Sequence, residues 1–519
     1  MQLGTANVTG RDTDIVGVVS AHSAGEVRSQ VEQARRSGTP LYPVSAGMNW
    51  GYGSASPVVP GCQVLDLSGM NRILNADDIS VDNPVAIVEP GVTQGQLSDF
   101  LEEHCPALTF NVTGAGRDTS IIGNALDRGV GYFGPRKDDL FGLEVVTGTG
   151  EIVRTGFRRL GDASPLAHSH PFGLGPMLDG LFFQGNFGIV TSACFRLRPR
   201  RPREVAVSLA LRRDEDLPAF IDALARLKRE GLLTSVTHIG NRARTVSTLS
   251  YGVTRYLEDA CGFDATAAAA EAERAMKVVA PHEWTSLASV SGNTGQVRAA
   301  IREIRQRTRK IARLMVITER LLDVGYAVTH RLRAIPFMRA NAAAIAATRP
   351  LHRLALGVPT DIPIQNLLWK FGHPNDRAVE LDASRCGLLF ISPALPLDGR
   401  LACEVVTGMQ EVASRHRHIL YMTLNIETET SLVAVINLLF DRSVPEEVER
   451  AHRCADDLLD YMRGRGLEPY RARADMMEKI VAADPDYWRL IHQLKTVFDP
   501  DNIIAPGRYG LAFGMGQKR

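Results

Sequence analysis

The chain has 519 residues and a mass of 56.7 kDa, which is enough for roughly two to four domains and a sizeable hydrophobic core. Its 59 lysines and arginines balance 58 aspartates and glutamates, so the formal net charge is +1. This balance excludes the basic surplus of a dedicated nucleic-acid or anionic-membrane binder. Hydrophobic residues at 45% and charged residues at 23% are typical of globular proteins and exclude a disordered or fibrous chain.

The sequence predicts a cytoplasmic location and no membrane segment. Residues 1–12 lack a basic stretch followed by an apolar core, so no secretory signal is expected. The longest apolar run, Leu432–Phe440, is far shorter than the ~20 residues that span a bilayer. Seven scattered cysteines without a CxxC motif are typical of free thiols. The two His-x-His pairs, which begin at His168 and His416, have no third ligand at metal spacing, so we expect no metal site.

The first elements along the chain indicate a βαβ unit. Ile15–Ser20 is an apolar, β-branched run that predicts a strand. Ser23 and Glu26 have the spacing of a capping box, and the helix that they begin ends at Gly38. Leu41–Val44 is predicted as the next strand.

A second predicted strand and capped helix follow. Val85–Val88 predicts a strand, and Thr93 with Gln96 predicts another capped helix. Leu143–Thr147 and Glu151–Thr155 flank the turn sequence Gly-Thr-Gly, which is typical of a β-hairpin.

The composition changes at Arg196–Arg203, where proline and arginine are concentrated, and this segment is a candidate junction. A helix-rich stretch follows, and the main elements expected there and beyond are an alanine-rich helix at Ala265–Val278, a long charged amphipathic segment at Arg298–Leu322, strands at Gly387–Ser392 and Ser431–Phe440, and a helix at Glu446–Arg463.

A glycine-rich turn follows the second predicted strand. Pro43–Ser54 reads PVSAGMNWGYGS, with glycines at 47, 51 and 53. Glycines let backbone N–H groups approach a diphosphate closely because no Cβ is in the way. The pattern is not GxGxxG and no helix follows at once, so a Rossmann site is the wrong interpretation. On its own, the segment fits an ordinary tight turn equally well.

Three more glycine-rich segments follow in order, at Asn111–Tyr132, Leu181–Thr191 and Phe498–Gly510. Four such segments are more specific than one. Together with Leu356–Trp369, Leu389–Pro393 and Pro469–Lys479, they make the sequence resemble the FAD-dependent vanillyl-alcohol oxidase / p-cresol methylhydroxylase (PCMH) family over most of its length.

The resemblance implies an α+β fold with a PCMH-type FAD-binding domain of two subdomains and a cap domain. It places the FAD-binding domain at 1–203, the cap at 204–465 and a C-terminal return to the FAD-binding domain at 466–519. The cap is expected to hold an antiparallel sheet flanked by helices. The resemblance implies that FAD contacts Pro43, Ser45, Ala46, Gly47, Met48, Asn49, Trp50, Gly51, Thr113, Gly114, Thr119, Ser120, Gly123, Asn124, Gly188, Ile189 and Val190.

Arg508, in the sequence APGR, matches a family cation near flavin N1. A positive charge there favours the anionic reduced flavin. The alternative is a surface arginine that follows a Pro-Gly turn.

Family members that oxidise para-substituted phenols hold the phenolate with two tyrosines and an arginine, and the matching residues are Tyr52, Tyr470 and Arg471. An arginine favours the phenolate over the phenol, and two tyrosine hydroxyls can donate to the oxyanion. Hydride loss from the para benzylic carbon to flavin N5 then leaves a quinone methide. The alternative is that Tyr52 packs in its turn and Arg471 pairs with Asp475.

The resemblance also suggests an aspartate near flavin N5 as acid/base. Asp138 or Asp139 could serve, although both also fit exposed loop acids. Relatives often link FAD covalently, but the positions that should carry the link hold Leu388, Met48 and Asn49. Leucine has no nucleophile, so we predict non-covalent FAD.

The predicted activity is therefore FAD-dependent oxidation of a para-substituted phenol, by an oxidase or a dehydrogenase. The alternatives are the same flavin fold acting on a non-phenolic alcohol or biosynthetic intermediate, or a non-redox FAD-dependent synthase. The expected partners are a small aromatic substrate and further copies of the chain, as a homodimer or a higher homo-oligomer.

Overall fold

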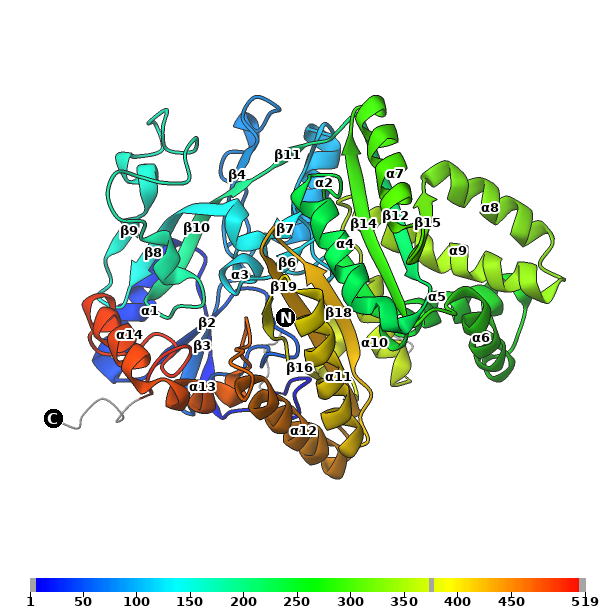
Figure 1. Cartoon of the computed structure of the whole chain (residues 1–519). Helices are drawn as coiled ribbons and strands as arrows, with labels where there is room; N and C mark the ends of the chain where they lie inside the picture. The colour runs from blue at the N-terminus through cyan, green and yellow to red at the C-terminus, as the bar shows by residue number, and fades with distance from the viewer. Residues whose placement is uncertain (1–5, 373–377, 513–519) are drawn as a thin grey trace.

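Figure 1 shows the computed structural model of the chain, which describes residues 6–372 and 378–512. The N-terminal lobe begins with a parallel sheet in the order β1–β3–β2, made of β1 (Ile15–Ser20), β2 (Leu41–Val44) and β3 (Cys62–Asp66). Helix α1 (Ala24–Ser37) connects β1 to β2, and the Ser23 hydroxyl accepts the N–H of Glu26 at its start. The predicted βαβ unit is confirmed, with β3 inserted between its two strands.

The second sheet of the N-terminal lobe is antiparallel, in the order β4–β10–β8–β9. Its strands are β4 (Val85–Val88), β8 (Leu140–Thr147), β9 (Ile152–Arg154) and β10 (Gly188–Arg196). Strands β8 and β9 form the predicted hairpin. Smaller elements of the chain are α2 (Gln94–His104), α3 (Ile121–Leu126), β5 (Leu108–Thr109), β6 (Val130–Gly131), β7 (Gly134–Pro135), β11 (Arg198–Pro199) and α10 (Ile362–Lys370).

An eight-stranded antiparallel sheet, the cap sheet, forms the centre of the rest of the chain. Its strands are β12 (Arg203–Leu211), β13 (Thr237–Asn241), β14 (Trp284–Gly292), β15 (Ala312–Ile317), β16 (Cys386–Phe390), β17 (Ala394–Pro396), β18 (Tyr421–Ile426) and β19 (Ser431–Asp441). Strand β11 still pairs with β5 of the N-terminal lobe, whereas β12 already belongs to the cap sheet. The domain boundary at residues 203 and 204 stays a prediction.

One face of the cap sheet is covered by four helices, α4 (Leu217–Arg229), α7 (Thr294–Thr308), α11 (Gly399–Arg415) and α12 (Pro445–Arg463). Alternate strand residues face this core, as the buried Met422, Leu424 and Ile426 of β18 show. Because side chains alternate along a strand, the residues between them point to the other face. That second face carries polar side chains and contacts the N-terminal lobe, where the N–H of Val236 donates to the carbonyl of Tyr132.

The segment Arg298–Leu322, expected as one amphipathic stretch, is divided into three elements. Helix α7 ends at Thr308, strand β15 follows, and α8 (Glu319–Arg331) begins after it. Strand β15 pairs with β12 over six residues, so tertiary pairing at a sheet edge overrides the helical pattern. The alanine-rich helix and the helix after residue 445 are confirmed as α6 (Ala265–Val279) and α12.

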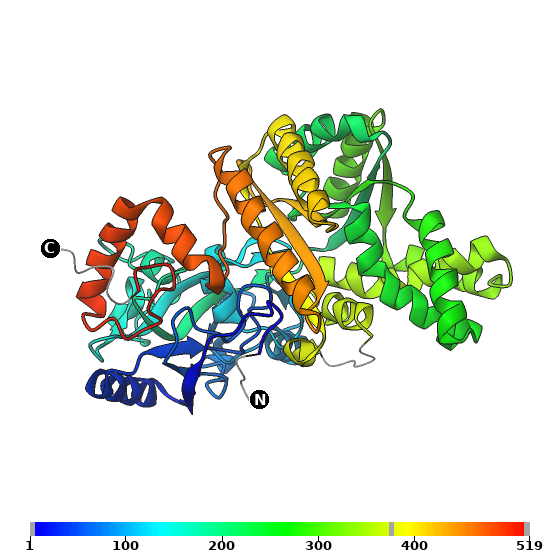
Figure 2. The ribbon, with the colours of Figure 1, turned by 90° about the horizontal axis from the view of Figure 1, so that it is seen from below.

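A helical lobe lies at the far end of the cap and contains α5 (Arg242–Cys261), α6, α8 and α9 (Pro336–Ala355) (Figures 1 and 2). Its core consists largely of alanine side chains, which allow helices to approach closely. A Cβ on Gly252 would lie 2.8 Å from the Cβ of Ala347, so glycine is required where α5 crosses α9.

The C-terminal segment returns to the N-terminal lobe, as Figure 2 shows. After α13 (Met477–Ala483) and α14 (Pro485–Phe498), the chain runs beside β2: the N–H of Leu41 donates to the carbonyl of Ile503, and the N–H of Ala505 donates to that of Leu41, both at 2.7 Å. Lys495 is buried beneath this segment and donates to Asp499 at 2.7 Å and to the carbonyl of Ile504 at 2.9 Å.

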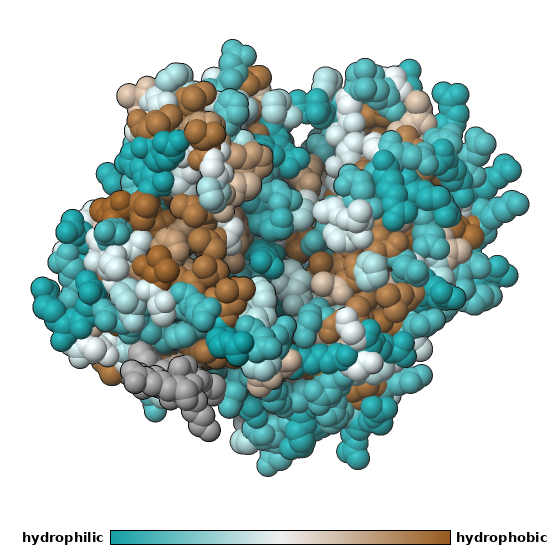
Figure 3. All heavy atoms as spheres, turned by 60° about the vertical axis from the view of Figure 1, so that its left-hand side comes forward, coloured by the Kyte–Doolittle hydropathy of each residue, from teal (hydrophilic) through white to brown (hydrophobic). Residues whose placement is uncertain are grey.

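Figure 3 turns the N-terminal lobe forward and shows apolar side chains gathered on that face. Helix α14 contributes Tyr487, Leu490, Leu494 and Val497, which are 39–71% exposed. Surfaces of this kind often mediate association between chains, but the homo-oligomer stays a prediction. Among the residues that the structure describes, no helix is long and apolar enough to cross a membrane.

Candidate active site

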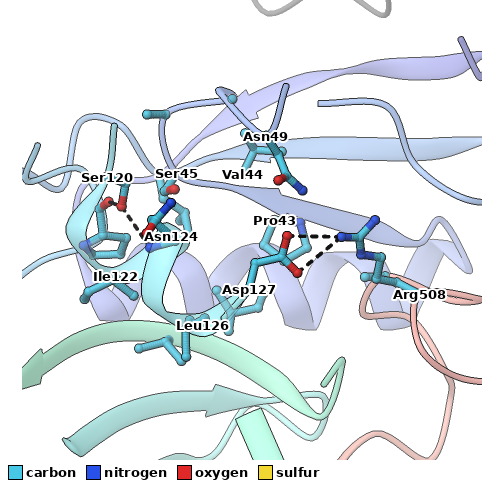
Figure 4. A pocket seen from close by; sticks show the side chains of 18 of the residues that line it. Pro43, Val44, Ser45, Asn49, Ser120, Ile122, Asn124, Leu126, Asp127 and Arg508 are labelled. Atoms are coloured by element: carbon cyan, nitrogen blue, oxygen red, sulfur yellow. Dashed lines mark hydrogen bonds and ion pairs between the residues drawn. The ribbon is translucent and has the colours of Figure 1, made fainter. Parts of the chain in front are cut away.

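A cavity in the N-terminal lobe is lined by residues of all four glycine-rich segments. Figure 4 labels lining residues of the first, second and fourth segments. It is lined by Pro43, Val44, Ser45, Ala46, Gly47, Met48, Asn49 and Ser54 of the first segment, by Thr119, Ser120, Ile122, Gly123, Asn124, Leu126 and Asp127 of the second, by Phe182, Gln184, Gly185, Gly188, Ile189 and Val190 of the third, by Ala505, Arg508 and Tyr509 of the fourth, and by Tyr42, Leu67, Pro90 and Arg471.

The turn after β2 presents backbone donors to this cavity. Within residues 6–372 and 378–512, the N–H groups of residues 46–49 donate to no acceptor of the chain. Gly47 has φ +71°, a left-handed conformation that favours glycine. A Cβ on Gly123 would lie 2.3 Å from the Ser45 hydroxyl, so the first two segments touch where a side chain has no room. Consecutive free N–H groups in a turn form an anion cradle of the kind that holds a diphosphate.

One end of the cavity is strongly charged. The half-buried carboxylate of Asp127 pairs with Arg471, and Arg508 Nη2 lies 3.4 Å from it; Figure 4 shows the pairing with Arg508. Arg471 also donates to the Asn49 side chain at 2.6 Å. Burial alone would raise the pKa of Asp127, but the two guanidiniums outweigh it and hold that pKa below its usual value. Two cations therefore share one anion, which leaves a net positive charge.

Two donor atoms at this end remain without a partner in the described chain. Arg471 Nε and Arg508 Nη1 are buried and make no hydrogen bond. Unpartnered buried donors are costly, so the cavity suits a large polar or anionic ligand that accepts hydrogen bonds. The free N–H groups of the glycine turn and the two cations fit FAD, whose diphosphate and isoalloxazine both carry hydrogen-bond acceptors.

The three predicted phenolate ligands meet beside this cavity. The Tyr52 ring stacks on the Phe390 ring at a centroid distance of 4.9 Å. The Arg471 guanidinium lies over the Tyr52 ring, 4.0 Å from its centroid. The half-buried Tyr470 side chain interacts with that of Tyr52. Residues from opposite ends of the sequence are joined here because the N–H of Ala474 donates to the carbonyl of Tyr52 at 3.0 Å.

The charge states at this point suit the binding of an oxyanion. Burial and the neighbouring Tyr52 raise the pKa of Tyr470 well above its usual value, so its hydroxyl remains a donor at neutral pH. Burial opposes the charge of Arg471, but Asp127 and the tyrosines raise the pKa of its guanidinium. The alternative pairing of Arg471 with Asp475 is wrong, because Asp475 pairs with Arg473 and His452.

Glu427, which the sequence did not single out, also faces this group. It follows β18, and its charge contributes to raising the Tyr470 pKa. Burial, together with the nearby Asp138, raises the pKa of Glu427 to about 7 despite Lys137. Its Oε1 is buried without a hydrogen-bond partner in the described chain. A carboxyl group with a pKa near neutrality can both accept and release a proton.

The family follows from two comparisons over nearly the whole chain. Residues 16–156 match the FAD binding domain family. The 1'-carboxy-chondrochloren decarboxylase of Chondromyces crocatus is 32% identical over 95% of this chain and 90% of its own length. The flavoprotein subunit of 4-cresol dehydrogenase [hydroxylating] of Pseudomonas putida is 27% identical over 95% of this chain and 87% of its own length. The chain belongs to the vanillyl-alcohol oxidase / p-cresol methylhydroxylase family.

Solved structures of vanillyl-alcohol oxidase / p-cresol methylhydroxylase proteins have the same fold. A structure of p-cresol methylhydroxylase with substrate bound superposes with a TM-score of 0.80 at 24% identity, covering 98% of this chain and 92% of that one. An isoeugenol complex of 4-ethylphenol oxidase from Gulosibacter chungangensis gives the same TM-score and coverage at 23% identity. The protein is thus an FAD-dependent oxidoreductase with a PCMH-type FAD-binding fold.

Most of the residues predicted to contact FAD line the cavity, but four of them, Trp50, Gly51, Thr113 and Gly114, do not. Trp50 Nε1 donates to Asp382, Gly51 lies against Phe390, the Thr113 N–H donates to Gln94, and Gly114 lies near Pro363. Direct contact of Trp50, Gly51, Thr113 and Gly114 with FAD stays a prediction.

The two predicted acid/base aspartates lie outside the cavity lining. Asp139 is fully buried, and its two oxygens are occupied by Asn111 at 2.8 Å and Arg198 at 3.1 Å. Asp138 is exposed and pairs with Lys137 at 2.6 Å. The acid/base role of Asp138 or Asp139 stays a prediction, and Glu427, which also lies outside the cavity lining, is a further candidate.

Proposed function

We propose that the protein oxidises a para-substituted phenol, bound as its phenolate by Tyr52, Tyr470 and Arg471. The observation that carries the proposal is the convergence of these three side chains beside the FAD cavity. Arg471 supplies the charge that favours deprotonation, and the protonated Tyr470 donates to the oxyanion. Bound FAD would accept the hydride from the para benzylic carbon.

Hydride loss converts the phenolate into a p-quinone methide, whose fate depends on the residues near its benzylic carbon. With Glu427 as a carboxylate, a water molecule can give its proton to Glu427 while its oxygen adds to the benzylic carbon, which yields an alcohol. Loss of a proton from the neighbouring side-chain carbon to water yields an alkene instead, and its electron pair forms the C=C bond while the ring returns to a phenolate. We propose Glu427 as the acid/base group that determines this partition.

The 32% sequence identity to a protein named 1'-carboxy-chondrochloren decarboxylase favours a third fate for the quinone methide. If the side chain carries a carboxylate on the carbon next to the benzylic one, the bond to that carboxylate can break. Its electron pair then forms the C=C bond, the ring returns to a phenolate and CO₂ leaves. The hydride taken up by FAD is the whole oxidation, and no external base is needed.

Product partition should depend on pH through Glu427. Because the pKa of Glu427 is about 7, the residue is protonated below neutrality and becomes a base above it. With 4-ethylphenol, we expect the fraction of alcohol product to rise with pH around 7. Glu427→Gln should give a low alcohol fraction that does not change with pH, as measured by chromatography of the products.

Asp138→Asn provides the matched control for Glu427. Removing this nearby negative charge lowers the Glu427 pKa, so the alcohol fraction should be kept and its midpoint should shift to lower pH. If Asp138→Asn abolished alcohol formation while Glu427→Gln did not, Asp138 would be the acid/base group instead.

Anaerobic flavin reduction tests the proposed function. We expect the yellow protein to lose its absorbance at about 450 nm when it is mixed with at least one member of a panel of 4-alkylphenols. Admission of air then shows whether the reduced flavin reacts with oxygen. Bleaching by non-phenolic alcohols alone would overturn the phenol proposal.

Non-covalent attachment of FAD stays a prediction as well: acid precipitation should release FAD to the supernatant.

A further inference from the structure

A second polar cluster lies on the face of the cap sheet that is turned toward the N-terminal lobe. His238 of β13 and Asn425 of β18 are opposite each other in the sheet, and His238 Nδ1 lies 2.7 Å from Asn425 Oδ1. The ring of Tyr132, which comes from the N-terminal lobe, is 4.7 Å from the His238 ring. Arg244, in the first turn of α5, lies on the same face of β13: a Cβ on Gly240, two residues after His238, would lie 3.8 Å from Arg244 Cγ. Its charge lowers the pKa values of both rings.

This cluster lies two residues along the chain from Glu427, which belongs to the proposed phenol site. Asn425 and Glu427 are two residues apart, so they share a face of the sheet and their Cα atoms are about 7 Å apart. The alternation continues to Glu427 because its N–H still pairs with the carbonyl of Ser431 at 3.2 Å. A para side chain that extends from the phenol past Glu427 would therefore run toward His238 and Arg244.

The charge of Arg244 has no partner within the part of the chain that the structure describes. Across residues 6–372 and 378–512, its guanidinium makes no hydrogen bond or ion pair, although burial is sufficient to lower its pKa. Its neighbour Arg242 differs, because it donates to the carbonyl of Ala280 at 3.0 Å. An unpaired cation in a partly buried position is costly, so a complementary anion is expected beside Arg244.

The surrounding groups restrict what that anion can be. Burial lowers the pKa of His238 to about 4, so this residue is neutral and adds no positive charge. Burial raises the pKa of Tyr132 to about 12, so its hydroxyl is protonated and can donate. The charge of Lys228 also acts on His238, but its ammonium group already donates to the carbonyl of Ser235 at 2.8 Å. The Arg244 cation and the Tyr132 hydroxyl remain, and they match the single charge and paired oxygens of a carboxylate. A phosphate dianion would leave excess negative charge.

We propose that Arg244 and Tyr132 bind a carboxylate carried by the para side chain of the substrate. This inference rests on the proposed phenol oxidation and names its substrate class: a 4-hydroxyphenyl compound with an acidic side chain. Arg244 is then a specificity-determining residue that orients the side chain along the cap sheet.

The test compares two phenols that differ only in this group, 3-(4-hydroxyphenyl)propanoate and 4-propylphenol, by isothermal titration calorimetry on the FAD-loaded protein. Wild type should bind the propanoate at least about 10-fold more tightly, which is the range of a charge-assisted contact. In Arg244→Gln the ratio of the two affinities should fall toward one, and Arg244→Lys, which retains the charge, should keep most of the preference.

Arg242→Gln is the matched control, because it removes an arginine from the same helical turn whose guanidinium is already engaged. It should leave the affinity ratio as in wild type. Equal affinities in wild type, or an unchanged ratio in Arg244→Gln, would overturn the carboxylate subsite whether or not the flavin is reduced. Absence of flavin reduction with both compounds, with the affinity ratio intact, would overturn the phenol oxidation alone.

Discussion

Arg471→Ala is expected to lower kcat/KM on a confirmed phenol by about 30- to 1000-fold, which corresponds to about 2–4 kcal/mol. Arg471 is the charged group beside both tyrosines, and its guanidinium lies 4.0 Å from the Tyr52 ring centroid. Without it, the bound phenol should remain largely protonated at neutral pH and should release hydride poorly. Stopped-flow flavin reduction under anaerobic conditions measures this step directly.

The ion pair between Arg508 and Asp127 remains in this variant. The experiment can therefore distinguish weaker phenolate binding from loss of FAD. In Arg471→Ala, Arg508 still lies 3.4 Å from Asp127, so the FAD cavity keeps one cation. Flavin content should be determined for each preparation, and rates should be expressed per bound FAD. Raising the pH should recover part of the lost rate, because a phenol ionises without help at high pH. A kcat/KM within threefold of wild type would show that Arg471 does not hold the phenolate.

Lys495→Met is expected to destabilise the fold by about 3–5 kcal/mol, because it leaves the buried Asp499 carboxylate without its counter-charge. Both side chains are almost completely buried, and Lys495 Nζ also donates to the carbonyls of Asn186 and Ile504 at 2.6 and 2.9 Å. These bonds attach the C-terminal segment that carries Arg508 to the N-terminal lobe. The FAD affinity should therefore fall together with the free energy of unfolding.

Urea unfolding of the Lys495→Met apoprotein gives this change in stability. The control is Arg28→Met, which breaks the exposed i,i+4 pair with Glu32 and should cost at most about 0.5 kcal/mol. If both variants unfolded at the same urea concentration, the buried pair would not be what holds the C-terminal segment in place.

Features encoded by neighbouring residues were accessible from the sequence. The strand at 15–20 and the glycine-rich segments that contain Gly47 and Gly123 depend on local patterns, and the structure places both segments against one cavity. Tyr52 and Arg471 each lie within a short recognisable motif, so they could be named although they are far apart in the chain.

Features that depend on long-range pairing were not accessible. Asp127 becomes significant only because folding places it between Arg471 and Arg508. Glu427 is an ordinary acid after a strand until the sheet register and the return of residue 470 bring it to Tyr470. Strand β15 lies within a segment predicted as one charged amphipathic stretch, and its pairing with β12 is a long-range contact that the local pattern did not reveal.

The ionisation state of a bound phenol tests the central claim most directly. The ligand 4-tert-butylphenol, labelled with ¹³C at the carbon that bears oxygen, has no benzylic hydrogen and therefore stays unreacted on the FAD-loaded protein. At pH 7 the account predicts the ¹³C shift of a phenolate in wild type and that of a phenol in Arg471→Ala, since a free phenol has a pKa of about 10. A neutral phenol in wild type, or the same spectrum in both proteins, would contradict the claim that Tyr52, Tyr470 and Arg471 bind the oxyanion.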